Sequence, residues 1–274
     1  MSITLIGPAQ IPSMGFGTFQ LEQDTVSDMV AAALSEGFRH IDTAQAYENE
    51  GQVGEGLRRA DVRRDDVFLT TKILPEHFLP EAFIAATDAS LKRLETDYVD
   101  LLLLHWPSKD VPISETIGAL NDLIAAGKVR HGGVSNFTMD MVNQAQAALN
   151  TPLAANQIEL HPLIDQTRMI AHLASKGIPL EAYSPLAQGK VMENATLRDI
   201  AAAHDASPAQ IALAWILTRP LSIALPRTGN INRLASNLRA AEIMLSADEI
   251  ARIDDLGKAE GRLVSPEALA PGWD

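Results

Sequence analysis

The feature that most constrains the fold is a regular alternation of short apolar runs with longer helical patterns along nearly the whole chain. In the helical patterns, apolar residues recur every three or four positions, as they do across residues 24–36. Alternating strands and helices predict a parallel sheet whose two faces are covered. Eight strands are expected, at residues 14–19, 39–43, 67–73, 98–105, 131–135, 154–159, 179–183 and 221–226.

Eight strand–helix units in 274 residues predict a (β/α)8 TIM barrel that forms one domain over residues 1–274, since such barrels take roughly 250 residues. Residues 101–104 are all leucine, as expected for a strand covered on both faces. An N-terminal β-hairpin is expected over residues 3–12, and a C-terminal loop from Leu256 onward. Ser246 and Glu249 have the spacing of a capping box, which predicts one more helix start.

A doubly wound open sheet is the alternative fold, and it needs a glycine-rich phosphate turn. Residues 15–20 fail the dinucleotide pattern at its last position, and residues 51–56 lack the Lys-Ser/Thr pair of a P-loop. The second segment is more typical of a helix start with small residues. The barrel is therefore favoured.

Composition excludes several functions. The net charge of −13 disfavours nucleic acid and anionic membranes as partners, because both require basic patches. The chain has no cysteine, which excludes disulfides, thiolate nucleophiles and cysteine-ligated metals, and its histidines lack metal-ligand spacing. No signal peptide and no apolar run of about 20 residues are present, so we expect a cytoplasmic protein with no metal and no membrane contact.

Polar residues stand where the apolar strands end, and barrel active sites lie at these carboxyl ends. Period-two alternation brings Asp42, Lys72 and His105 together at the mouth if their faces point inward. Each residue alone has a structural explanation: Asp42 could cap a turn, Lys72 could be solvated, and His105 and the nearby Tyr47 could pack in the core. The combination is more informative than any one of them.

Together these residues predict a proton donor. A lysine held between Asp42 and Tyr47 would stay cationic and would lower the phenol pKa from its reference value of about 10. Such a tyrosine can act as a general acid near neutral pH. A neutral His105 could hold a carbonyl oxygen beside it.

These residues and the segments around them resemble the aldo-keto reductases. The similar segments begin at Gly15 and continue to the C-terminus, and the ending at residues 262–274 is most similar to a bacterial branch that reduces diketo sugar acids. The motifs include His40-Ile41-Asp42-Thr43-Ala44, Leu69-Thr70-Thr71-Lys72, Leu103-Leu104-His105-Trp106-Pro107, Gly133-Val134-Ser135-Asn136-Phe137, Asn156-Gln157-Ile158-Glu159 and Tyr183-Ser184-Pro185-Leu186.

The resemblance implies reduction of small aldehydes and ketones by NADPH, with Tyr47 as proton donor, Lys72 and Asp42 tuning it and His105 orienting the carbonyl. Diketo sugar acids and 2-oxoaldehydes such as methylglyoxal are the implied substrates, and a monomer is implied. The implied substrate-binding residues are Phe19, Ala46, Tyr47, His105, Trp106 and Trp273. The implied cofactor-binding residues are Gly17, Thr18, Asp42, Ser135, Asn136, Gln157, Tyr183, Ser184, Leu186, Arg227, Thr228, Arg233 and Asn237.

The segment after the eighth strand supports the cofactor independently. It is a usual phosphate site in these barrels, and arginine suits phosphate binding. Arg227-Thr228 stands where the family usually has Lys-Ser, so charge and hydroxyl are kept and NADPH is favoured over NADH. Phe19 stands where many members have tryptophan, which predicts a roomier pocket.

Two other functions remain open at this point. A Schiff-base aldolase on the same barrel could use Lys72 as nucleophile, although this needs a neutral lysine. A non-catalytic barrel that senses cofactor would be expected to lack one of the four catalytic residues, and all four are present.

Overall fold

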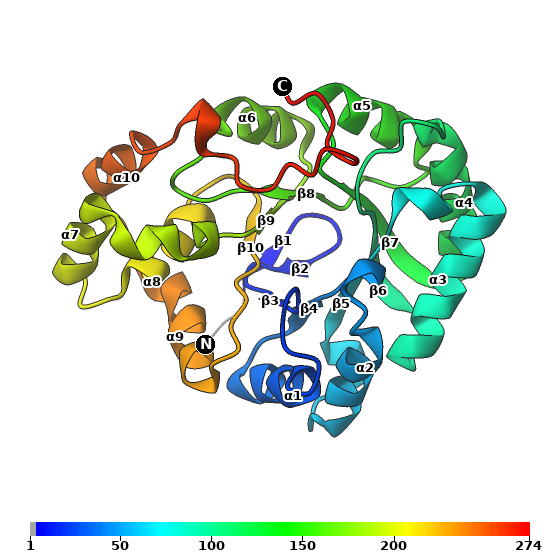
Figure 1. The fold of residues 1–274 in the computed structure, drawn as a ribbon, viewed down its shortest axis with the longest axis horizontal. Helices are drawn as coiled ribbons and strands as arrows, with labels where there is room; N and C mark the ends of the chain where they lie inside the picture. Colours follow the sequence, from blue (N-terminus) through cyan, green and yellow to red (C-terminus); the bar gives the residue numbers. More distant parts are fainter. Residues whose placement is uncertain (1–3) are drawn as a thin grey trace.

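The structure, a computed structural model that describes residues 4–274, is a parallel barrel surrounded by helices (Figure 1). The strands follow the order β10-β9-β8-β7-β6-β5-β4-β3, and a parallel bridge between Met14 and Ala224 joins the two ends. The predicted (β/α)8 fold is confirmed. The strands are β3 (Phe16–Gly17), β4 (His40–Asp42), β5 (Phe68–Ile73), β6 (Val99–Leu104), β7 (Val129–Ser135), β8 (Asn156–Glu159), β9 (Leu180–Tyr183) and β10 (Ser222–Ala224).

Helices cover the outside of this sheet, as its composition requires. Every residue of β6 is buried, because parallel strands in such a barrel are packed on both faces. The helices are α1 (Val26–Glu36), α2 (Glu50–Arg59), α3 (Pro80–Leu94), α4 (Ile113–Ala125), α5 (Met139–Ala148), α6 (Thr167–Lys176), α7 (Ala195–Ala203), α8 (Pro208–Leu217), α9 (Leu234–Arg239) and α10 (Ala247–Asp254). None of them, within residues 4–274, is long and apolar enough to cross a membrane.

A hairpin closes one end of the barrel, which leaves the other end for chemistry. Strands β1 (Leu5–Ile6) and β2 (Ile11–Pro12) pair antiparallel and lie in the centre of the ring (Figure 1). Ile11 packs in a buried cluster with inward residues of β6 and β10, among them Leu101, Leu103 and Ile223. The hairpin predicted over residues 3–12 is confirmed from residue 5 onward, and residue 3 lies outside the described part.

The glycines at residues 51–56 serve packing. A Cβ at Gly54 would come within 2.5 Å of the Leu94 carbonyl oxygen, and one at Gly56 within 2.7 Å of Val30. Only glycine therefore lets α2 lie this close to α1 and α3. The interpretation of this segment as a helix start with small residues is confirmed.

One predicted strand is much shorter than expected, and one helix was missed. The strand expected at residues 14–19 is only Phe16–Gly17, because Thr18 turns to bond the Asp42 carbonyl, with N–O 3.0 Å. Helix α7 was not predicted, although Asn194 caps it and Leu197, Ile200 and Ala201 are buried at helical spacing. The capping box predicted at Ser246 is present, and Ser207 forms another at the start of α8.

Candidate active site

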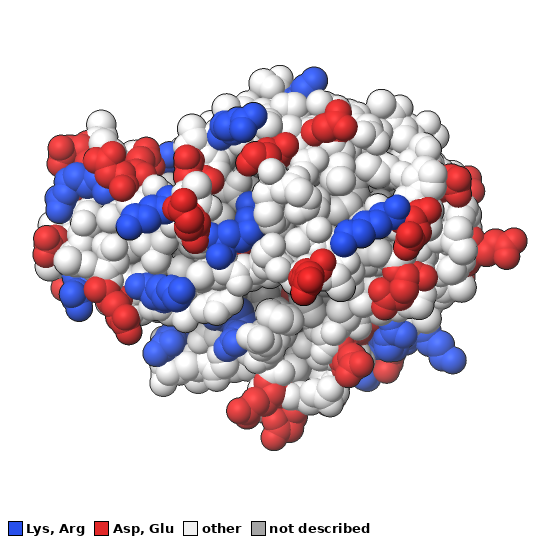
Figure 2. All heavy atoms as spheres, turned by 45° about the horizontal axis from the view of Figure 1, so that its top comes forward, with Lys and Arg blue, Asp and Glu red and all other residues white. Residues whose placement is uncertain are grey.

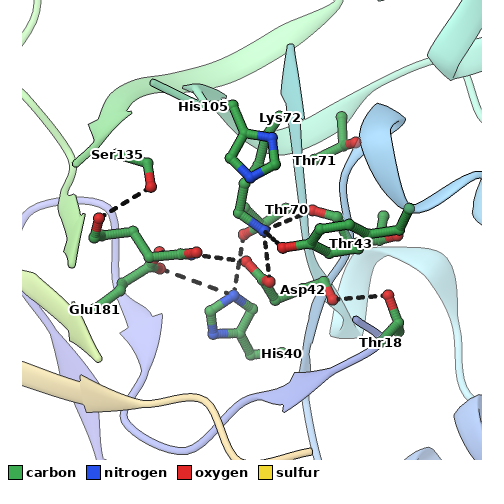
Figure 3. Close-up of polar contacts among 12 residues, drawn as sticks. Thr18, His40, Asp42, Thr43, Thr70, Thr71, Lys72, His105, Ser135 and Glu181 are labelled. Atoms are coloured by element: carbon green, nitrogen blue, oxygen red, sulfur yellow. Dashed lines mark hydrogen bonds and ion pairs between the residues drawn. The ribbon is translucent and has the colours of Figure 1, made fainter. Parts of the chain in front are cut away.

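The four predicted catalytic residues meet at the open end of the barrel (Figure 3). Lys72 Nζ lies 2.6 Å from Asp42 Oδ1 and 3.2 Å from the Tyr47 hydroxyl. The Tyr47 and His105 rings are 5.8 Å apart at 76°. Asp42 and Lys72 are buried at 4% and 0% exposure, whereas Tyr47 and His105 are partly exposed at the mouth. The geometry that the strand-end pattern predicts is therefore present.

A short turn after β4 brings the tyrosine to the lysine. Residues Gln45–Tyr47 form a 3-10 turn, in which the Tyr47 N–H donates to the Ala44 carbonyl at 3.0 Å. Glu48 then adopts a left-handed conformation with φ 55°, which ends the turn. Asn49 fixes the loop by donating from Nδ2 to the Thr18 carbonyl at 2.9 Å.

The lysine ammonium has a partner for each of its three hydrogens. It donates to Asp42 Oδ1, to the Thr43 carbonyl at 2.8 Å and to the Tyr47 hydroxyl. Burial is the largest single effect and lowers the pKa of Lys72, but Asp42 and Tyr47, through charge and hydrogen bonds, together outweigh it, and the net pKa is raised. Lys72 is therefore cationic at neutral pH.

The prediction that the pKa of Tyr47 is lowered is wrong, because its net pKa is raised. Burial of the phenol raises the pKa of Tyr47, and the Lys72 charge lowers it by a smaller amount. Tyr47 is thus a protonated phenol with a cation at its oxygen. The phenol is therefore protonated at neutral pH, and the Lys72 charge would stabilise the phenolate that forms when the proton leaves.

His105 is neutral, as expected. Burial, reinforced by the Lys72 charge, holds the pKa of His105 well below its usual range. Nδ1 of the ring is buried and has no hydrogen-bond partner in the described part of the chain. A neutral ring can donate one N–H to a carbonyl oxygen.

The residues expected at the nicotinamide form one hydrogen-bonded row across the ends of β7, β8 and β9. Ser135 Oγ donates to the Gln157 carbonyl at 3.0 Å, and Asn136 Nδ2 donates to Ser135 Oγ at 3.1 Å. The Tyr183 hydroxyl donates to Asn136 Oδ1 at 2.7 Å. Gln157 Nε2 donates to Asp42 Oδ2 at 2.8 Å, which connects the row to the lysine pair.

The Gln157 side chain in this row keeps an acceptor that suits an amide ligand. Carboxylates can only accept, so the Gln157 amide must turn Nε2 toward Asp42 and keep Oε1 on the other side. Asn136 has φ 63° and Ser184 has φ 49°, left-handed conformations that are typical of ligand-contacting turns. The residues present therefore fit a nicotinamide carboxamide.

The other expected cofactor residues lie in two loops. Gly17, which ends β3, donates its N–H to the Pro226 carbonyl at 3.0 Å, so the loops after β3 and β10 are neighbours. Arg227 reaches Gln20 at 3.5 Å, and Arg233 is exposed at the start of α9. Ser184 and Leu186 follow β9, and Thr228 and Asn237 are buried at 6% exposure each.

Aromatic side chains line the expected substrate side. The Phe19 ring is 50% exposed and lies 4.9 Å from the Tyr47 ring. Trp106 is buried, and Trp273 packs against it with ring centroids 6.2 Å apart. Ala46 is exposed beside Tyr47.

Sequence reasoning missed two buried glutamates. Glu181 accepts the second hydrogen of Gln157 Nε2 at 2.8 Å, and its Oε1 lies 3.9 Å from His40 Nε2. Glu159 ends β8 at 0% exposure. Glu181 could have been found as a lone charged residue inside an apolar strand pattern, between Leu180 and Ala182. Glu159 also shares the inward face of Gln157, since faces alternate along a strand.

The surface and the acidic clusters suggest no other site. On the face in Figure 2, acidic and basic side chains are interspersed without a one-sided patch. Within residues 4–274, no group of three His, Asp or Glu side chains could hold a metal ion.

A parallel barrel with a Tyr–Lys–Asp–His cluster and a row of hydrogen-bonded polar side chains at its open end is the architecture of an oxidoreductase that acts on carbonyl groups. The chain belongs to the aldo/keto reductase family, whose model matches residues 13–258. Members of this family use a nicotinamide cofactor. The predicted family membership is confirmed.

Individual relatives match over nearly their whole length. Methylglyoxal reductase DkgB of Yersinia pestis is 40% identical over 267 residues, which cover 96% of this chain and 99% of that protein. Glyoxal reductase of Bacillus subtilis (strain 168) is 35% identical over 269 residues, covering 98% and 97%. A crystal structure provisionally named 2,5-diketo-D-gluconic acid reductase B has a TM-score of 0.97 and 42% identity, covering 100% of this chain and 98% of that one. The predicted similarity to this bacterial branch is confirmed.

Proposed function

We propose that this protein reduces small aldehydes and ketones with NADPH, with Tyr47 as the proton donor. The observation that carries the proposal is the contact of the Lys72 ammonium with both Asp42 and the Tyr47 hydroxyl. The bound cofactor would supply a hydride to the carbonyl carbon. Ser135, Asn136 and Gln157 would hold its carboxamide, and the Tyr183 ring would lie against its nicotinamide.

The chain's own residues supply the proton and the orientation. The neutral His105 donates a hydrogen bond that orients the carbonyl oxygen toward Tyr47. Tyr47 gives its proton to that oxygen as negative charge develops there. The phenolate that remains is stabilised by the Lys72 ammonium 3.2 Å away, and Asp42 keeps that ammonium charged.

The roles of the arginines and the substrate class are part of this proposal. Arg227, Thr228, Arg233 and Asn237 would hold the adenosine end, with Arg233 at the 2′-phosphate that distinguishes NADPH. The names of the relatives, a methylglyoxal reductase and a glyoxal reductase, support 2-oxoaldehydes as substrates, and the diketogluconate reductase name supports diketo sugar acids.

The aldolase alternative is disfavoured by the lysine's surroundings. A Schiff base requires a neutral amine with a free lone pair. Lys72 has a raised pKa and donates all its hydrogens. Its nitrogen has no lone pair to offer.

The proposal is tested by following NADPH oxidation over a panel of aldehydes, diketones and oxo acids. Tyr47→Phe should lower kcat by about 10²- to 10⁴-fold, the usual contribution of a general acid, and leave the Kd for NADPH unchanged. Near-wild-type turnover by the variant would contradict the role of Tyr47. Borohydride trapping of a substrate adduct on Lys72 would favour the aldolase instead.

A further inference from the structure

Glu159 is a buried carboxylate at the mouth that the proposed reaction does not use. It ends β8, on the face that Gln157 presents to the barrel interior, and its side chain is 0% exposed. A buried carboxylate is costly unless hydrogen bonds and opposite charges compensate it. Its partners therefore indicate what it is for.

All but one of those partners come from the far end of the chain, and the exception is the neighbouring His161. The backbone N–H groups of Leu263 and Val264 donate to Glu159 Oε1 at 2.8 Å and Oε2 at 3.0 Å. His161 Nδ1 accepts from the Leu163 N–H at 3.2 Å, so its proton lies on Nε2, which donates to Glu159 Oε1 at 3.1 Å. Arg262 Nη1 adds positive charge 4.0 Å from Oε2.

The segment that Glu159 binds, residues 262–274, is here called the C-terminal tail, and it crosses the ring of helices in Figure 1. Its entry is fixed because Gly261 packs directly on the Leu163 carbonyl, where any Cβ would overlap the oxygen. Its end is fixed because Asp274 Oδ2 accepts from the Met139 N–H at 2.8 Å, at the N-terminus of α5.

Between these two fixed points the tail presents an aromatic side chain. The Arg262 guanidinium lies 3.6 Å above the Trp273 ring, and Trp273 Nε1 donates to Ser265 Oγ at 3.1 Å. Trp273 also packs against Trp106, the residue that follows His105. Arg262, which precedes the two residues bound to Glu159, thus also stacks on Trp273.

We propose that Glu159 is a positioning residue that fastens the C-terminal tail to the barrel and through it holds Trp273 against Trp106 as a wall of the substrate pocket. This inference rests on the proposed function only in its last step, the use of that wall by a substrate. The fastening itself is a property of the free protein.

The first experiment measures the fastening without cofactor or substrate. Glu159→Gln keeps the shape of the side chain but turns an NH2 group toward one of the two tail N–H donors. Trypsin cleavage after Arg262 should become about tenfold faster or more, because cleavage follows the population of the opened tail and a hydrogen bond to a charged group is worth at least that factor. Glu260→Gln, an exposed neighbour, should cleave at the wild-type rate.

A second variant changes the tail and leaves the barrel untouched. Val264→Pro removes one of the two N–H donors, so it should accelerate cleavage at the same bond even if Glu159→Gln does not fold. Wild-type cleavage rates in whichever of these variants fold would overturn the proposal.

The last experiment measures the effect on the pocket. In Val264→Pro and Glu159→Gln, the KM for methylglyoxal should rise about fivefold or more, while kcat and the Kd for NADPH stay within about twofold. Trp273→Ala should raise KM to a similar extent. Faster cleavage with an unchanged KM would show that Trp273 is not a wall of the substrate pocket. A wild-type protein without reductase activity would refute the proposed function, whereas the cleavage result would still test the fastening of the tail.

Discussion

Removing the charge of Lys72 should destabilise the protein far more than removing an exposed charge. Lys72 and Asp42 are 0% and 4% exposed and 2.6 Å apart, so Lys72→Met leaves a buried carboxylate without its counter-charge. Breaking such a pair typically costs about 3–5 kcal/mol. For a chain of this size, that corresponds to a fall in Tm of roughly 6–20 °C.

A double-mutant cycle separates the buried charge from lost packing. In Asp42→Asn/Lys72→Met both charges are gone, and the amide oxygen introduced at position 42 can still accept from Gln157 Nε2. The double variant should recover most of the stability that Lys72→Met loses, because replacing both partners is close to neutral. Urea unfolding of the wild type, both single variants and the double variant gives the coupling free energy.

The matched control is an exposed ion pair. Arg58 and Glu95 are 56% and 55% exposed, so Arg58→Met should cost about 0–1 kcal/mol. If Lys72→Met loses no more than this control, or if the double variant is less stable than Lys72→Met, the argument that Asp42 must be paired is refuted.

Three other predictions concern the cofactor and pH. Arg233→Ala should raise the Kd for NADPH about tenfold or more and the Kd for NADH by less than about twofold, with the exposed Arg239→Ala as control, and fluorescence titration measures both; equal losses would remove the 2′-phosphate role. Burial raises the pKa of Glu181 from 4.5 to about 8, so folding stability should fall as pH rises through the interval between these values, because the unfolded chain ionises first. Burial lowers the pKa of His40 from 6.5 to about 4, so stability should also fall as pH drops through that interval. In urea unfolding, Glu181→Gln should flatten the high-pH loss alone, and an unchanged pH profile would contradict it.

The fold and the convergence of the four candidate catalytic residues could be predicted because they depend on local pattern. Strand positions follow from apolar runs, and inward faces follow from period-two alternation, so Asp42 and Lys72 could be placed side by side before any coordinates. The register confirms this, since Asp42 pairs with Thr70, two residues before Lys72 on β5.

What could not be predicted depends on packing among distant segments. The sign of the Tyr47 pKa shift depends on how deeply the loop after β4 is covered, and burial outweighs the Lys72 charge. The role of Glu159 depends on a tail more than 100 residues away, at Leu263 and Val264. Its position on the face of Gln157 was readable, but its partners were not.

The seam of the barrel has a consequence for the order of folding. The barrel closes where Met14 forms a bridge with Ala224. The N-terminal hairpin that covers the bottom of the barrel packs through Ile11 in one buried cluster with Ile223. Because synthesis begins at the N-terminus, the hairpin leaves the ribosome long before Ile223 and Ala224 are made. The first strands therefore wait, with apolar surface uncovered, for roughly 200 residues of synthesis. Such long-range closure is slow, so a chaperone or a co-translational pause would have most effect before the eighth strand emerges.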